Sequence, residues 1–181
     1  MPATSKPELA AEKLLRDAGC QKIPISLDRI AERLGIEIVK KNLGGELSGV
    51  LIKKEGESVA IVVNSGQLPT RQRFTTAHEL GHYVLKHPGE MFVDATLRQK
   101  AIVVKRDGRS SEGTDRHEIE ANRFAAELLM PRQMVEEAIS KQLSKSKPTA
   151  ESLVSELASR FEVSNQAMEI RLVNLGFLIP D

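Results

Sequence analysis

Residues 78–82, with the sequence HELGH, could place two metal ligands and a catalytic base on one stretch of helix. Side chains four positions apart lie on the same face of a helix, so His78 and His82 would offer two imidazole nitrogens to one ion. Glu79 lies between them and would be the base for the water that the metal activates. Zinc hydrolases use this pattern, although a lone HExxH also occurs by chance in unrelated helices.

A catalytic zinc site needs a third protein ligand from another part of the chain and an open position for water. Glu118 and Asn122 are four positions apart in a predicted helix, so Glu118 could bind zinc while Asn122 orients a histidine ligand. Glu120 is the rival third ligand, but it lies about 200° round the helix from Glu118, so only one of them can face the metal. His117 is a less favoured alternative, and His87 is interpreted as a solvated side chain off the helix face.

The elements that would position these residues are mostly helices, with one small sheet before the HELGH helix. Apolar periodicity, caps and prolines predict helices at about 7–18, 27–34, 70–86, 117–130 and 131–143, followed by two helices around a turn at 162–164. Three β-type runs at 36–39, 47–53 and 58–63 predict an antiparallel sheet, with a hairpin loop at Gly56. Gly81 would allow another helix to approach the HELGH helix closely. The polar residues 105–116 are expected to form a mobile surface loop.

Composition narrows the class of protein. The 181 residues are 40% hydrophobic but only 3% aromatic, so the chain can bury a core, and that core must be aliphatic. Lys and Arg number 26 against 25 Asp and Glu, which gives no electrostatic argument for bulk nucleic-acid or membrane binding. The single cysteine excludes an internal disulfide and suits a reducing compartment. No run approaches the roughly 20 apolar residues of a membrane span, and the N-terminus lacks signal-peptide features, so a cytoplasmic protein is expected.

Two segments in this order point to a family. RFTTAHELGHYVLKH at 73–87 and EIEANRFAAELLMP at 118–131 closely resemble the ImmA/IrrE family of zinc metallopeptidases. The helix–strand segment at 25–38 and the C-terminal segment at 161–178 also look similar. The resemblance therefore covers nearly the whole chain.

The resemblance implies an α+β, thermolysin-like minimal zincin fold, with His78, His82 and Glu118 as zinc ligands and Glu79 as the catalytic residue. It also implies a narrow substrate, a partner helix-turn-helix repressor, whose cleavage would relieve repression of a mobile element, a stress operon or a toxin–antitoxin-like operon. Tyr83 is not assigned as the residue that stabilises the oxyanion, because it lies about 100° round the helix from His82.

Two units are expected, a zincin-like metallopeptidase domain at 1–143 and a helix-turn-helix-like helical subdomain at 150–181 packed on it, joined by a linker-like stretch. The second unit raises an alternative: a DNA-binding or repressor-sequestering regulator with a non-catalytic metal site. Against DNA binding, the would-be recognition helix carries Glu169 and a single basic residue, Arg171. Direct nucleic-acid binding is therefore the less favoured interpretation.

Overall fold

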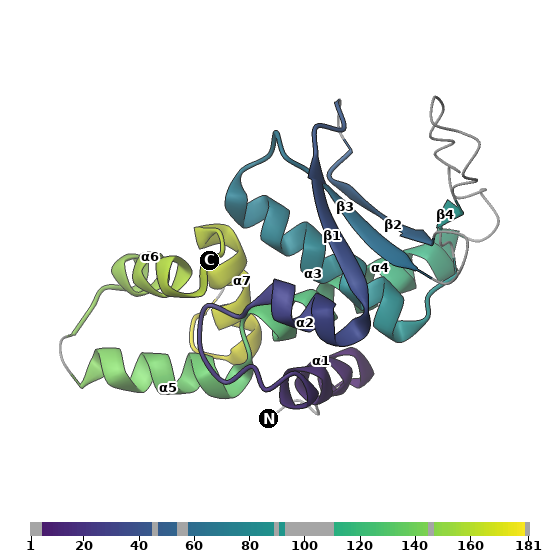
Figure 1. Cartoon of the computed structure of the whole chain (residues 1–181). Helices are drawn as coiled ribbons and strands as arrows, with labels where there is room; N and C mark the ends of the chain where they lie inside the picture. Colours follow the sequence, from purple (N-terminus) through teal and green to yellow (C-terminus); the bar gives the residue numbers. More distant parts are fainter. Residues whose placement is uncertain are drawn as a thin grey trace.

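A computed structural model describes residues 5–44, 47–53, 58–88, 91–92, 111–144 and 147–179. Within these ranges the chain is an α+β protein of seven helices and a four-stranded sheet (Figure 1). In chain order, the elements are α1 (Lys6–Asp17), α2 (Leu27–Leu34), β1 (Ile36–Lys41), β2 (Gly49–Lys53), β3 (Val59–Asn64), α3 (Pro69–Leu85), β4 (Met91–Phe92), α4 (Ser111–Leu129), α5 (Arg132–Leu143), α6 (Ala150–Phe161) and α7 (Asn165–Leu175). None of the helices described here has both the length and the apolar character that a bilayer crossing requires.

Capping residues explain where several helices begin and end. The Ser26 hydroxyl accepts a hydrogen bond from the backbone N–H three residues on, and Gly35 ends α2 in the left-handed conformation, with φ of 69°. Ser164 caps α7 in the same manner, accepting from the Ala167 N–H at 3.1 Å. The predicted second helix and the predicted turn at 162–164 are therefore confirmed.

The sheet is mixed, so the expected antiparallel sheet is wrong. Its strand order is β1-β3-β2-β4, with β2 antiparallel to β3 but β1 parallel to β3 and β4 parallel to β2. The central strand β3 has five buried residues among its six, which is the continuous apolar pattern of a strand covered on both faces. The hairpin loop predicted at Gly56 lies outside the described residues.

Helix α3 lies between the sheet and α4, and it packs against β2 and β3 on one side and against α4 on the other (Figure 1). Gly81 lies directly against α4. A Cβ atom added there would lie 3.2 Å from the Ala121 Cα and 3.1 Å from the Phe124 Cδ1. The absence of a side chain at Gly81 therefore sets the separation of the two helices that carry the candidate ligands.

Adding a methyl group at this crossing should force α3 and α4 apart. Overpacking of this kind costs about 1–3 kcal/mol, whereas exchanging Gly for Ala in a helix interior gains about 1 kcal/mol. We expect Gly81→Ala to lower the free energy of unfolding by about 1 kcal/mol in urea denaturation. Ser155→Ala on the exposed face of α6 is the control. A Gly81→Ala variant more stable than the parent would contradict the tight crossing.

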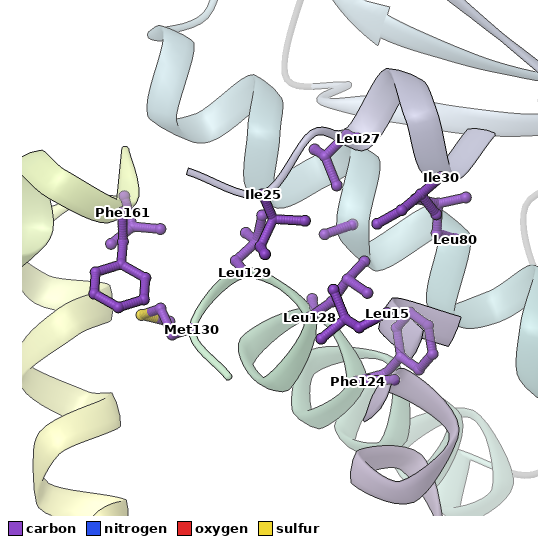
Figure 2. Close-up of a cluster of buried hydrophobic side chains, with 14 of the residues drawn as sticks. Leu15, Ile25, Leu27, Ile30, Leu80, Phe124, Leu128, Leu129, Met130 and Phe161 are labelled. Atoms are coloured by element: carbon purple, nitrogen blue, oxygen red, sulfur yellow. The ribbon is translucent and has the colours of Figure 1, made fainter. Parts of the chain in front are cut away.

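The core is aliphatic, as the composition predicts, and it runs without a break from α1 to α7. Leu80 and Ile30 meet Phe124 and Leu128 of α4 in its centre (Figure 2). Farther along α4, Met130 lies beside Phe161 of α6, which extends the same cluster into the C-terminal helices. The boundary expected between two units at 143–150 stays a prediction.

A buried ion pair ties α7 to the end of α4. The Arg171 guanidinium pairs with the Glu127 carboxylate, and both side chains are about 95% buried. The Arg171 Nε also donates to the Met130 carbonyl at 3.0 Å, while the second Glu127 oxygen accepts from the Arg132 N–H at 3.0 Å. Glu127 therefore holds the start of α5 and the middle of α7 against the helix that carries Glu118.

Helix α4 begins earlier than expected. The sequence predicts a loop over 105–116, but the structure is helical from Ser111, so that the loop prediction is wrong for 111–116. A single glycine in a helix interior costs only about 1 kcal/mol, and a helix already packed through its later turns can extend over it. Residues 105–110 lie outside the described residues.

Candidate metal centre

His78 and His82 face one another from successive turns of α3. Their Nε2 atoms are 3.0 Å apart, and their ring centroids are 4.7 Å apart. Their backbone N–H groups and carbonyls are used in the helix, so the imidazole rings are the groups available for chemistry. His82 is buried, whereas His78 lies at the edge of a groove.

Glu118 brings a carboxylate from α4 to this pair of imidazoles. Its Oε2 is 3.2 Å from the His78 Nε2, and its Oε1 is 3.4 Å from the His82 Nε2. Together the three residues form a group that could hold a metal ion, because one ligand atom from each lies within 4.8 Å of the others. The approach of α3 to α4 at Gly81 explains this convergence, since Glu118 lies one helical turn before Ala121 on the facing helix.

Asn122 lies one turn beyond Glu118 and reaches the far side of the His78 ring. Its Oδ1 is 3.0 Å from the His78 Nδ1. An amide oxygen only accepts hydrogen bonds, so this contact places the proton of a neutral His78 on Nδ1 and leaves the lone pair of Nε2 facing Glu118. Tyr83, left unassigned from the sequence, is half-buried and packs on the core.

A groove of about 1010 Å³ runs past this group, and Glu79 lines it beside His78 and Glu118. One wall comes from the residues around the start of β2 and the first turns of α3, and the other from α4 and α7. Half of the exposed large apolar side chains among the described residues line the groove: Leu47, Leu68, Ile119 and Ile170. The groove is therefore an open, partly apolar channel with the candidate ligands in its wall.

His87 is not the solvated side chain that the sequence suggests. It is 6% exposed, and its Nδ1 lies 3.1 Å from the Nδ1 of His82, on the ring edge opposite Glu118. Burial lowers the pKa of His87, and the hydrogen bond to Glu120 opposes that shift. The backbone at Lys86 explains why His87 lies behind His82. Lys86 ends α3 in the left-handed conformation, with φ of 56°, so the chain reverses and the next residue packs back against the helix.

Glu120, the rival third ligand, belongs to this second layer. Its Oε2 is 3.1 Å from the His87 Nε2, and its Oε1 accepts from the Arg116 Nε at 3.0 Å. The Arg116 hydrogen bond, and then the one to His87, hold the pKa of Glu120 below its usual value. His117, the other alternative, stacks on His87 with ring centroids 4.5 Å apart. The sequence did not predict that His87, Glu120 and His117 gather behind His82, because their position depends on the left-handed backbone conformation of Lys86.

The fold and the group of two imidazoles and a carboxylate define an α+β domain with a candidate metal centre beside an open groove. Residues 31–173 match the IrrE N-terminal-like domain of the M78 peptidases, and the chain belongs to this family. The resemblance found in the sequence is therefore confirmed.

Two curated relatives share part of this chain. It is 31% identical over 102 residues to an uncharacterized immunity region protein 2 of Bacillus phage phi105, covering 56% of each protein. It is 36% identical over 109 residues to the radiation response metalloprotease IrrE of Deinococcus radiodurans, covering 60% of this chain and 29% of that protein. The chain thus spans less than two thirds of the length of either relative.

A solved structure shares the fold. A Mycobacterium tuberculosis transcriptional regulator superposes with a TM-score of 0.61 at 18% sequence identity, covering 92% of this chain and 46% of that one. At this identity the likeness extends to the fold alone.

Proposed function

We propose that the chain is a zinc-dependent metalloendopeptidase in which His78, His82 and Glu118 hold zinc and Glu79 is the general base. The observation that carries the proposal is the convergence of two imidazole nitrogens and a carboxylate, on two helices locked together, in the wall of an open groove. Membership of the M78 peptidases and the name of the metalloprotease relative support it. In this proposal the domain is zincin-like, with the arrangement of HExxH and downstream Glu found in gluzincins.

The donor set fits a small tetrahedral ion. Ligand atoms bonded to one zinc ion at about 2.0–2.2 Å lie about 3.3–3.5 Å from each other. The two Nε2 atoms are 3.0 Å apart, and each lies 3.2–3.4 Å from one oxygen of the Glu118 carboxylate, Oε2 for His78 and Oε1 for His82, so one small cation could contact all three side chains. Imidazole nitrogen and carboxylate oxygen are also the ligand types that catalytic zinc prefers.

When bound, zinc supplies a Lewis acid that polarises the scissile carbonyl and lowers the pKa of water toward neutrality. The residues of the chain supply the rest. The carboxylate of Glu79 takes a proton from the attacking water and returns it to the nitrogen of the leaving amine. Asn122 holds the ring of His78 by accepting from Nδ1, and the groove binds the peptide on either side of the scissile bond.

We further propose that the substrate is a helix-turn-helix repressor and that the chain works in the cytoplasm. The groove is open and partly apolar, and α7 forms part of one wall, so that a C-terminal unit at 150–181 would help to select the substrate. The names of the two relatives, an immunity region protein of a phage and a radiation response metalloprotease, support a role in the control of a mobile element or a stress operon.

The test is cleavage of a helix-turn-helix repressor from the same organism, beginning with any that is encoded beside this chain. We expect zinc-loaded protein to cut it at a discrete bond, read by mass spectrometry, and to act slowly on casein. His82→Ala should lose both zinc and cleavage, because one ligand is gone. Rapid digestion of casein with the repressor left intact would contradict the proposed substrate. Equal zinc content in His82→Ala and the parent would contradict the proposed metal site.

Direct DNA binding through α6 and α7 is less well supported. The only basic residue of α7 is Arg171, and its guanidinium is buried against Glu127 and the Met130 carbonyl. A recognition helix contacts phosphates and bases through exposed side chains. In this chain α7 turns its one basic residue inward, which favours a role in packing and in lining the groove.

A further inference from the structure

The four histidines of the chain lie in one row, although the proposed metal site uses only two of them. His78 and His82 carry the facing Nε2 atoms, and His87 and His117 continue the row behind His82, with successive ring centroids 4.7, 5.0 and 4.5 Å apart. The contacts of His87 with His117 and Glu120, which both lie on α4, join the row to that helix. A buried imidazole with hydrogen-bonding contacts at both nitrogens, beside a candidate ligand, is more than packing requires.

Four side chains form a continuous chain of polar contacts. The His82 Nδ1 lies 3.1 Å from the His87 Nδ1, and the His87 Nε2 lies 3.1 Å from the Glu120 Oε2. The Glu120 Oε1 in turn accepts from the Arg116 Nε at 3.0 Å. These three contacts are within hydrogen-bonding range, and each can pair one donor with one acceptor.

The carboxylate determines the direction of every bond in this chain. An ionised Glu120 can only accept, so the His87 Nε2 carries a proton and donates it. A neutral His87 then has its lone pair on Nδ1, which accepts from the Nδ1–H of His82. A neutral His82 then carries no proton on Nε2, the nitrogen that lies 3.4 Å from the Glu118 Oε1 and 3.0 Å from the His78 Nε2.

We propose that His87 and Glu120 are positioning residues that fix the tautomer and ring orientation of His82, so that its Nε2 lone pair faces the metal site. The role in metal binding rests on the proposed function, whereas the tautomer does not. His78 is held in the same way by Asn122, so each imidazole has its own acceptor behind it. The two ligands differ in that His82 is held by a buried relay through a second imidazole.

The tautomer of His82 is measured in the metal-free protein by nitrogen-15 NMR of the imidazole rings, at mildly alkaline pH where neutral rings dominate. We expect the parent to show His82 protonated at Nδ1. His87→Phe should lose this preference and bind zinc about 10–100-fold more weakly in a chelator competition, which is the usual effect of losing an outer partner of a ligand. His87→Gln should restore much of both, because its amide can accept from His82 and donate to Glu120.

His117→Phe is the matched control, since it keeps an aromatic ring stacked on His87 and leaves the relay intact. It should change neither the tautomer nor the zinc affinity. A parent whose His82 is protonated at Nε2, or a His87→Phe variant with the parent's tautomer and affinity, would overturn the proposal. If the parent shows the expected tautomer but binds no zinc, the relay stands and the proposed metalloendopeptidase function fails.

Discussion

Glu79→Gln is expected to lower the rate of substrate cleavage by about 10²–10⁴-fold, the usual contribution of a general base, while the fold and the zinc content stay unchanged. Glu79 lies on α3 between the two histidines and lines the groove, but it is outside the group of candidate ligands. Glutamine keeps the shape of the side chain and removes the proton acceptor. The loss should therefore appear in the rate of the cleavage step rather than in metal binding.

The measurement is single-turnover cleavage of the repressor by parent and variant at matched zinc occupancy. Glu169→Gln, which removes an exposed carboxylate outside the groove, is the control and should cleave at the parent's rate. A Glu79→Gln variant that still cleaves at nearly the parent's rate would refute the proposed mechanism. A protein that sequesters its partner without cutting it would then be the better interpretation.

Arg171→Met should lower the free energy of unfolding by about 3–5 kcal/mol, the range measured when one partner of a buried ion pair is removed. The substitution keeps most of the side-chain volume but leaves the Glu127 carboxylate buried without its guanidinium partner. It also removes the donor to the Met130 carbonyl. Urea denaturation of the whole chain measures the effect.

Two further variants separate the charge effect from general damage. Arg16→Met removes an arginine that is 70% exposed and 3.9 Å from Glu12, and surface pairs of this kind contribute about 1 kcal/mol or less. The double variant Arg171→Met with Glu127→Gln should be more stable than Arg171→Met alone, because no buried charge is left. A loss of less than about 1 kcal/mol in Arg171→Met would show that Glu127 finds water or another partner at little cost.

Local signals predicted most of the helices, and tertiary contacts decided what the sequence got wrong. Ser26 and Gly35 frame α2 with an N-cap and a left-handed C-cap, and Pro69 and Pro88 bracket α3, so those boundaries follow from side-chain chemistry. The pairing of the strands cannot be predicted in this way, because an apolar run does not indicate whether the neighbouring strand is parallel or antiparallel to it. The buried run of β3 was nevertheless a sign of a central strand.

The candidate site shows the same division. Helical periodicity places His78 beside His82 and Glu118 in line with Asn122, and the structure brings these four side chains together. Nothing in the spacing reveals that the chain reverses at Lys86 and returns the next imidazole to the back of a ligand. A lysine rarely adopts the left-handed conformation, so the sequence around Lys86 predicts only that the helix ends there and not that the chain reverses.

Helix α7 has an inner face that the fold requires and an outer face that the fold leaves free. Met168, Arg171 and Leu172 are buried and anchor the helix to the end of α4. Ile170 and Asn174 are exposed to the groove instead. In the proposed peptidase, substitutions on the outer face would change which peptides the groove accepts without disturbing the packing that holds Glu118 in place. Selectivity would then diverge between lineages on this one surface while the proposed chemistry on α3 and α4 is inherited intact.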